Sequence, residues 1–409
     1  MSSVGIAVTS KEYWKGTDAI EKKLGSDLNR KVTSSTKQVL LEKIEFKEAS
    51  KPDPFYQDLK TKYTPLNSTS LNQQNGSNQR QNTTKDKKHF EGNSKVSKDE
   101  LPAPKFFLFK KDKVHLQWKT TRTVGPGLFN LGNTCFLNSV IQVLTYTPPL
   151  VNYLATQEHS KTCASVGFCM LCELQRHVLR TFSHGPNEAI KPLAILQKLK
   201  YIAKHLRFGH QEDSHEFLRY VIDGMMKSCL AGHSAKLDVY TKATTMVHQV
   251  FGGYYRSQVT CEKCHHTSNT YDPLMEVLLD IKHVHSMLNA LHRLISAELL
   301  NGDNMYLCPR CKRKVPARKS LRIHEPPNIM TTCLKRFDSH SLFASKINKE
   351  ISYPERLNLR PFMSSSQGPA VHYKLYAVLV HSGYSCNSGH YYCFVKAANN
   401  QWYQMNDSL

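Results

Sequence analysis

Two Cys-x-x-Cys pairs constrain the fold of this chain more than any other feature. They occur as CEKC, with Cys261 and Cys264, and as CPRC, with Cys308 and Cys311. Four thiolates at this spacing suit one tetrahedral zinc ion, and four protein ligands leave no open position for chemistry, so the zinc is expected to be structural. Because the segment between the pairs is longer than in a compact zinc finger, we expect the pairs at the tips of two adjacent β-hairpins. The alternative is four unrelated buried thiols.

A second cysteine-rich group has ligand spacing too. Its members are His159, Cys163, Cys169 and Cys172, with His-x3-Cys and Cys-x-x-Cys spacing that also fits one tetrahedral ion. Two alternatives stay open here, because His159 can be an exposed residue at a helix end and Cys163 an idle loop thiol. The cysteines without a partner at ligand spacing are interpreted as buried or incidental: Cys229, Cys333, Cys386 and Cys393.

Composition narrows the class of protein. Hydrophobic residues make up 40% and charged residues 22% of the 409 residues, which is typical of globular proteins. No apolar run approaches the roughly 18 residues of a membrane span, and the first residues lack the basic and apolar regions of a secretory signal. We therefore expect an intracellular protein without a membrane partner. The formal charge of +22 favours acidic partners such as nucleic acid, although such an excess can equally be a solvated surface.

The chain divides near residue 120. Residues 1–120 are predicted to form an extension that is largely disordered, with a short helix at 37–46 and a polar, disordered stretch at 67–98. The segment 105–118 alternates apolar and polar residues and is interpreted as a strand on the main domain. That domain is placed at 121–409, with helices up to about residue 232 and mainly strands after about residue 245.

Cys135 is a candidate nucleophile because of its place in GLFNLGNTCFLNSVIQVLTYTPP. The segment begins with small and polar residues and continues with apolar residues at helical spacing, until Pro148 and Pro149 end the helix. Cys135 is therefore expected at a helix N-terminus, where unpaired amides and the helix dipole favour a thiolate. The alternative is a small buried hydrophobic residue.

His390 is the candidate general base. Gly389 before it permits close backbone approach, and the following YYCFV is typical of a buried strand. Asn406 or Asp407, after the strand-like QWYQM, can accept a hydrogen bond from the imidazole and fix its tautomer. A histidine considered alone is more often structural.

Together these segments resemble the conserved boxes of one enzyme family. GLFNLGNTCFLNSVIQ is similar to the cysteine box, and GHYYCFV with WYQMND to the histidine box, of the ubiquitin-specific proteases, which are papain-like cysteine deubiquitinases. QEDSHEFL and LKRF match two further blocks, so the resemblance runs from about Gly125 to Leu409. It implies an α+β, papain-like cysteine protease fold with a helical thumb, a β-sheet palm and zinc-bearing β fingers that grip ubiquitin. The implied reaction is hydrolysis of isopeptide bonds at the C-terminal glycine of ubiquitin, with ubiquitin and ubiquitinated proteins as partners.

The resemblance also implies catalytic roles for individual residues. Cys135 becomes the nucleophile, His390 the base, Asn406 the third member of the triad and Asp407 an adjacent helper. Asn130 matches the side chain that stabilises the oxyanion of the tetrahedral intermediate. Without the resemblance, Asn130 is equally well a turn residue.

Three more residues match positions that bind the tail of ubiquitin. Asp213 and Glu216 correspond to contacts with its basic C-terminal tail, although charges on a helix surface are the simple alternative. Tyr391 is expected to line the narrow channel that admits a diglycine. The resemblance also implies that the four-cysteine zinc site lies in the fingers of the fold.

Two further expectations concern location and activity. TYTPPL, RFGHQEDSHEFLRY and VHSGYSCNSGHYYCFVKA are most similar to a nucleolar member of the family, which implies a nuclear and nucleolar location. Family domains continue through another strand beyond the position of Leu409, so we expect an unpaired sheet edge near the triad. The alternatives are a ubiquitin-binding form with little or no activity and a basic, zinc-containing interaction module.

Overall fold

The structure is a computed structural model in which residues 3–9, 100–337, 346–385 and 388–408 are described. All of them belong to one compact unit, which takes in residues 100–120 and a strand near the N-terminus beside the predicted domain. The predicted helix at 37–46 and the predicted disorder at 67–98 lie outside the described residues. Among the described helices, none is long and apolar enough to cross a membrane.

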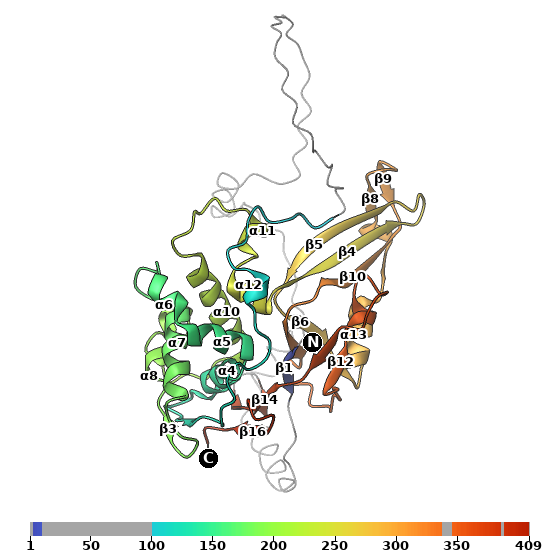
Figure 1. Ribbon diagram of the computed structural model, residues 1–409. Helices are drawn as coiled ribbons and strands as arrows, with labels where there is room; N and C mark the ends of the chain where they lie inside the picture. The colour runs from blue at the N-terminus through green and yellow to red at the C-terminus, as the bar shows by residue number, and fades with distance from the viewer. Residues whose placement is uncertain (1–2, 10–99, 338–345, 386–387, 409) are drawn as a thin grey trace, which may run out of the picture. The chain divides into compact units, whose positions relative to one another are not determined.

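Residues 125–251 form a helical region, here called the thumb (Figure 1). This agrees with the helical periodicity of the sequence. Two short parallel strands, β2 (Gly127–Leu128) and β3 (Ala189–Ile190), pair the start of this region with its middle. Its helices are α4 (Cys135–Thr145), α5 (Pro148–Thr156), α6 (Glu158–Thr162), α7 (Met170–Thr181), α8 (Leu193–Leu196), α9 (Leu199–Ile202), α10 (Ser214–Leu230), α11 (Val239–Lys242) and α12 (Met246–Phe251).

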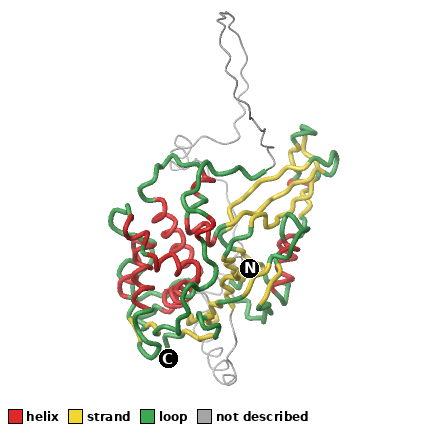
Figure 2. The backbone as a smooth tube through the Cα atoms, in the orientation of Figure 1, coloured by secondary structure: helices red, strands yellow, loops and turns green. Residues whose placement is uncertain are grey.

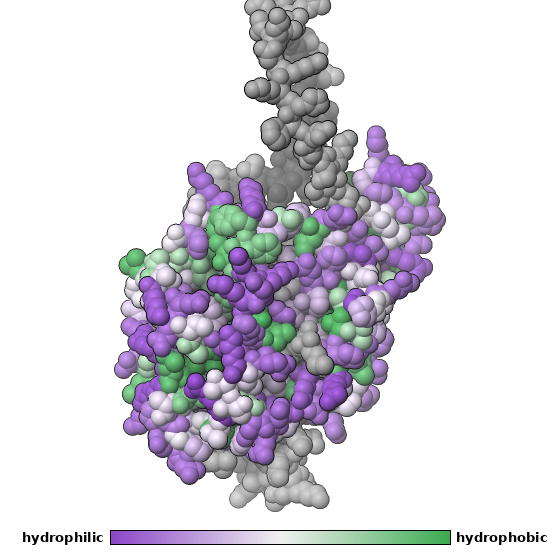
Figure 3. Space-filling model, viewed as in Figure 1, coloured by the Kyte–Doolittle hydropathy of each residue, from purple (hydrophilic) through white to green (hydrophobic). Residues whose placement is uncertain are grey.

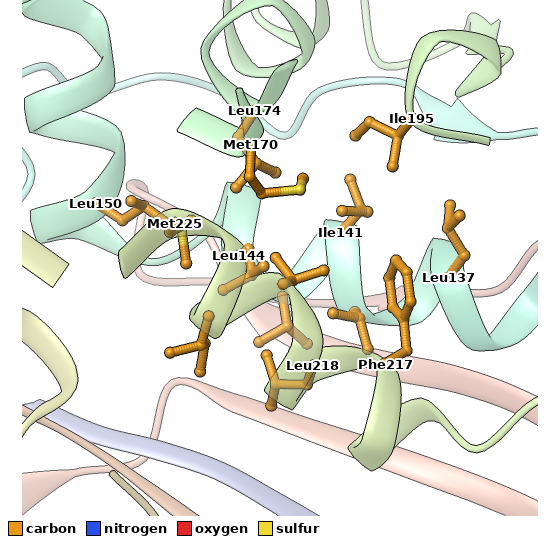
Figure 4. Close-up of a cluster of buried hydrophobic side chains, with 14 of the residues drawn as sticks. Leu137, Ile141, Leu144, Leu150, Met170, Leu174, Ile195, Phe217, Leu218 and Met225 are labelled. Carbon is orange, nitrogen blue, oxygen red and sulfur yellow. The ribbon is translucent and has the colours of Figure 1, made fainter. Parts of the chain in front are cut away.

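Helix α4 is the centre of the thumb core. Its side chains are buried all round, and Leu137, Ile141 and Leu144 face Phe217 of α10 and Met170 of α7 (Figure 4). Because α4 is enclosed on all sides, its packing fixes the start of the helix relative to its neighbours. The helix ends at Thr145, before Pro148 and Pro149 as predicted. The two prolines then begin α5, where proline is favoured because it has no amide hydrogen to leave unpaired.

A six-stranded sheet, here called the palm, lies against the thumb (Figures 1 and 2). Its strand order is β16 (Trp402–Met405), β15 (Ser388–Lys396), β14 (Ala377–Ser385), β1 (Ser3–Thr9), β11 (Ile329–Lys335) and β6 (Val277–Asp280). Leu379 of β14 faces the thumb core, while Val378 and Val380 enter a second core on the other side. This alternation is the period of two that a sheet buried on both faces requires. The remaining palm elements are β12 (Arg356–Asn358), β13 (His372–Lys374), α13 (Met287–Ile295) and the 3-10 helix at Arg360–Phe362.

The expected sheet edge near the triad lies at β16, which among the described strands pairs only with β15, whereas the histidine strand β15 is paired on both sides. β14 pairs with β15 on one side and with β1 on the other, where β1 runs parallel to both β14 and β11. The backbone groups of β14 are therefore satisfied by a strand from the other end of the chain. β16, which precedes Asn406, is the last strand on its side of the sheet.

A second sheet with a terminal hairpin extends from the palm and is here called the fingers (Figure 1). Its strand order is β5 (Thr267–Leu274), β4 (Gly253–Cys261), β10 (Ala317–Glu325) and β7 (Glu298–Leu300), and a separate hairpin joins β8 (Tyr306–Cys308) to β9 (Arg313–Val315). A 3-10 helix at Gly302–Asn304 leads into that hairpin. The helical first half, the β-rich second half and these fingers give the predicted α+β fold.

The segment 105–118 is not the predicted strand. It runs as an irregular chain with one 3-10 helix at Lys111–Lys113. Its amides bond to a helical neighbour instead of a sheet, since Leu108 N donates to Thr244 Oγ1 at 2.8 Å and Phe109 N to the Thr244 carbonyl at 3.0 Å. Alternation of apolar residues predicted a strand here, but no strand edge is available beside the α11–α12 turn.

Candidate active site

Cys135 is the first residue of α4, as predicted, and it is 3% exposed. The chain reaches it through a turn in which Gly132 and Asn133 both have positive φ, at 93° and 55°. Asn133 Nδ2 donates to the Gly209 carbonyl at 2.8 Å, which offsets the cost of this backbone conformation and ties the turn to the loop before α10. The sulfur is thus fixed at the positive end of a buried helix.

Asn130 orders the turn before Cys135. Its Oδ1 accepts from the amides of Gly132 at 3.1 Å and Thr134 at 3.3 Å. Asn130 is therefore a turn residue, as the simpler interpretation predicted. The same bonds fix the position of its oxygen and leave Nδ2 available as a donor. The role of that donor in stabilising an oxyanion stays a prediction.

His390 lies near the start of β15, on the strand next to the one that ends before Asn406. Its Nε2 is 2.7 Å from Asn406 Oδ1. The Ser408 amide donates to the same atom at 3.2 Å, which shows that this atom of the Asn406 side chain is the oxygen and not the nitrogen. Nε2 must therefore carry the proton, and Nδ1 is available to the thiol. The hydrogen bond to Cys135 raises the pKa of His390 to about 9, with a further contribution from Asn406, against the opposite effect of burial. Cys135, His390 and Asn406 thus form a connected set.

Asp407 has a different position from Asn406. Its side chain is 4% exposed, and its Oδ1 is 3.6 Å from His390 Nε2, too far for a hydrogen bond. Its Oδ2 accepts from Asn138 Nδ2 at 2.6 Å. Asp407 therefore acts on His390 through its charge, and Asn138 connects that charge to the helix of the nucleophile. Sequence reasoning missed Asn138, although it lies one helical turn after Cys135.

The start of α10 faces the strand of His390. Asp213 is the N-cap of α10 and accepts from the Glu216 amide at 2.8 Å, so one of its oxygens is already used. Tyr391 is 6% exposed, its hydroxyl lies close to Ser214, and burial raises its pKa. Glu216 is 45% exposed and lies 3.7 Å from His205. The structure thus brings Asp213 close to Tyr391, and their contacts with a ubiquitin tail stay predictions.

Two contacts around Gly389 were not predicted. Gln211 Nε2 donates to the Gly389 carbonyl at 3.1 Å, joining the thumb to the residue before His390. On the other side, a side chain at Gly389 would meet His381 Nε2 at 2.4 Å, so the position requires glycine. Burial lowers the pKa of His381 to about 4, and Lys346 Nζ donates to its neutral ring at 3.1 Å. Gln211 is the first residue of the QEDSHEFL block, so the sequence offered a reason to expect a role for it. No sequence pattern pointed to Lys346.

The fingers bring the four predicted cysteines together. The ligand sulfurs of Cys261, Cys264, Cys308 and Cys311 all lie within 4.8 Å of one another, at the tips of the β4–β5 and β8–β9 hairpins as expected. In each pair the first sulfur accepts from the amide three residues later, at 3.4 Å. This donor set suits a structural zinc ion. His159, Cys163, Cys169 and Cys172 are also brought together in the thumb.

Comparison with known proteins agrees with this geometry. A family model described as ubiquitin carboxyl-terminal hydrolase matches residues 126–409. The chain is 49% identical over 311 residues to ubiquitin carboxyl-terminal hydrolase 42 of Homo sapiens, covering 76% of this chain and 23% of that protein. It is 45% identical over 302 residues to ubiquitin carboxyl-terminal hydrolase 17-like protein 6 of Homo sapiens, covering 74% of this chain and 73% of that protein.

Among solved structures, the SAGA Ubp8/Sgf11/Sus1/Sgf73 DUB module bound to ubiquitin aldehyde is similar to this fold. The TM-score is 0.62 at 29% identity, covering 69% of this chain and 64% of that chain. Fold, cysteine tetrad and family model thus agree over most of the chain. The chain belongs to the ubiquitin carboxyl-terminal hydrolase family, as one of the ubiquitin-specific proteases.

Proposed function

We propose that this chain is a thiol-dependent deubiquitinase that hydrolyses isopeptide bonds at the C-terminal glycine of ubiquitin. The observation that carries this proposal is the position of His390, which interacts with Cys135 strongly enough to raise its own pKa and is 2.7 Å from Asn406 Oδ1. A base that is oriented in this way can activate a thiol and later protonate a leaving amine. Family membership and the ubiquitin aldehyde bound by the similar DUB module supply the substrate class.

In the first half of the reaction, His390 holds the proton of the Cys135 thiol. The thiolate attacks the carbonyl carbon of the terminal glycine, forming a carbon–sulfur bond and a tetrahedral oxyanion. Amides at the start of α4 and the Nδ2 of Asn130, whose Oδ1 is held by the Gly132 amide, are proposed to donate to this oxyanion. The carbon–nitrogen bond then breaks, and the substrate lysine amine leaves with the proton from His390.

In the second half, water resolves the thioester. His390 accepts a proton from the water as it attacks the thioester carbon, and the sulfur leaves as the thiolate. Asn406 keeps Nε2 protonated through both halves, because its Oδ1 can only accept a hydrogen bond. The products are ubiquitin with a free C-terminal carboxylate and the regenerated cysteine.

Substrate selection follows from the groups that face this centre. The carboxylates of Asp213 and Glu216 suit a basic tail, and buried Tyr391 with Gly389 limits the size of the residues that pass. The fingers are proposed to hold the body of ubiquitin. A tail that ends in glycines meets both requirements, because glycine has no side chain.

The test is a ubiquitin probe with an electrophile at its C-terminus. We expect it to attach to Cys135 in the wild type and not in Cys135→Ala. Cys229→Ala is the matched control, since Cys229 is a half-buried thumb thiol at no ligand spacing, and it should be labelled like the wild type. Ubiquitin binding without labelling would instead support a binding protein with little activity. Affinity for RNA with neither event would support a basic interaction module.

We also propose that the substrates are nuclear and nucleolar. Support comes from the net charge of +22 and from the fingers, where residues 308–322 contain basic residues and no acidic one. The basic residues of this segment are Arg310, Lys312, Arg313, Lys314, Arg318, Lys319 and Arg322. Hydrophilic side chains cover this end of the molecule in Figure 3, and such a surface favours nucleic-acid-rich surroundings. Fluorescence microscopy of the tagged chain tests the location, and exclusion from the nucleus would contradict it.

A further inference from the structure

The thumb holds a second cluster of metal-ligand side chains, remote in sequence from both the triad and the fingers. The Nε2 of His159 lies 3.0 Å from the sulfur of Cys169, and the ligand atoms of His159, Cys163, Cys169 and Cys172 all lie within 4.8 Å of one another. Four donors at such distances can surround one ion. His159 lies in α6 and Cys163 directly follows that helix, while Cys169 is the N-cap of α7 and Cys172 lies in its first turn.

The cluster repeats a backbone detail of the fingers. The Cys172 amide points to the Cys169 sulfur at 3.5 Å, as the Cys264 and Cys311 amides point to the first sulfur of their pairs at 3.4 Å. This turn orients both sulfurs of a Cys-x-x-Cys pair toward one point, and amide hydrogen bonds stabilise a sulfur that carries negative charge. The thumb has one such turn and completes its donor set with His159 and Cys163.

Ordinary buried thiols would be arranged differently. Cys163 and Cys172 pack at the margin of the thumb core and are half-buried, and core packing does not explain why the half-buried imidazole of His159 joins them. The connection also needs support, because α6 has five residues and buries none of them. A helix this short is not stable alone. Apart from the contact of His159 with Cys169, a direct link to α7 is the bond from Gln175 Nε2 to Ser160 Oγ at 2.8 Å.

We propose that His159, Cys163, Cys169 and Cys172 bind one structural zinc ion that fastens α6 to the start of α7. One imidazole and three thiolates form a donor set that selects zinc, and four protein ligands leave no position for a substrate. This site does not depend on the proposed hydrolase activity. Its effect reaches α10 through the Met170 amide, which donates to Ser228 Oγ at 3.1 Å near the end of α10 distant from Asp213. Loss of the ion should therefore reduce thumb stability more than it affects the triad.

Zinc content of the purified full chain is the first test. We expect two zinc ions per chain in the wild type, one in Cys169→Ser/Cys172→Ser and one in Cys261→Ser/Cys264→Ser. Cys229→Ser, the matched control, should retain two. One zinc in the wild type, with no change in the thumb variant, would overturn the proposal. A disulfide between Cys169 and Cys172, detected as two missing thiols in a thiol count of the unfolded protein, would also overturn the proposal.

A second measurement covers the case in which the thumb variant does not fold. Cobalt replaces zinc in the Cys261→Ser/Cys264→Ser variant, which keeps the whole thumb cluster. We expect the intense visible absorption of tetrahedral cobalt, with thiolate charge-transfer bands, at one equivalent of metal. A weak octahedral spectrum in that variant would contradict the proposal. Probe labelling measured on the same samples separates this result from the fate of the proposed activity.

Discussion

The catalytic seam and the fingers tip are held together in different ways. The catalytic seam is the contact of α4 with β15 and β16, and the fingers tip comprises the β4–β5 and β8–β9 turns. At the seam, Cys135 and Tyr391 are part of the large apolar core that extends through the thumb. At the tip, the buried apolar cluster among the described residues consists of Cys261, Cys308 and Val315, and two of these belong to the cysteine tetrad.

This difference shows where the stability of each region comes from. Burial of apolar surface contributes about 25 cal/mol per Å², so the seam can be formed before any ligand binds. The tip has too little apolar surface for this, and zinc coordination supplies the free energy that folds it. One region is therefore expected to be insensitive to chelation and the other to depend on it.

Substitution of the base should have the largest effect and should be confined to the seam. His390→Gln removes the group that holds the Cys135 proton, and we expect the hydrolysis rate to fall by about 10³-fold or more. Zinc content and the folded state should be unchanged, because the imidazole is partly exposed and distant from the cysteine tetrad in the sequence. The measurement is turnover of a ubiquitin fluorogenic substrate, and loss of zinc in this variant would show that the two regions are coupled.

Removal of the fingers metal should have the next largest effect. In Cys261→Ser/Cys308→Ser the tip loses its main support, and we expect kcat/KM for a ubiquitin substrate to fall by roughly 10- to 100-fold, mainly through KM. The control substrate is a fluorogenic peptide that ends in two glycines and cannot reach the fingers. Its hydrolysis should be almost unchanged, and an equal loss on both substrates would contradict the separation of the two regions.

The sequence was sufficient where one pattern determined one contact. Helical periodicity placed Cys135 at the first residue of α4, and Cys-x-x-Cys spacing brought four fingers cysteines to two hairpin tips. It was insufficient where a contact depended on which distant elements become neighbours. Three contacts join residues that share no local sequence pattern. They are the pairing of β1 with β14, the hydrogen bond between Asn138 and Asp407, and the hydrogen bond from Lys346 to His381. The prediction of a strand at 105–118 was wrong for the same reason, because the alternation of apolar residues does not show which neighbour accepts hydrogen bonds from its backbone amides.

Asn138→Ala tests whether the seam depends on a single bond across it. The variant leaves the Asp407 carboxylate buried without its partner at 2.6 Å, which should cost about 2 to 3 kcal/mol. The hydrolysis rate should fall roughly 10-fold, because the charge of Asp407 is no longer held beside His390. Chemical denaturation and turnover are the two measurements.

Asn152→Ala is the matched control for this variant. Asn152 is also buried on a thumb helix, at 8% exposed, and its Nδ2 donates to the His115 and Gln117 carbonyls at 3.0 and 2.7 Å. Its loss should reduce stability by a similar amount without changing the rate of the folded enzyme. If both variants lose rate equally, Asn138 is merely structural.

The smallest effect expected is a pH dependence of opposite sign in the two regions. The folded pKa of His390 is about 9, above the ordinary 6.5, so its protonation stabilises the fold fully below about pH 6.5, and this contribution is lost as the pH rises through 9. The side chain is 29% exposed, so solvent screening reduces the contribution to roughly 1–2 kcal/mol. We therefore expect the free energy of unfolding of the wild type, minus that of His390→Gln, to decrease between pH 6.5 and 9. The fingers tip should weaken in the other direction, because protons compete with zinc for thiolates as the pH falls. A stability difference that grows with pH would mean that the pKa of His390 is not raised in the folded chain, and would contradict this prediction.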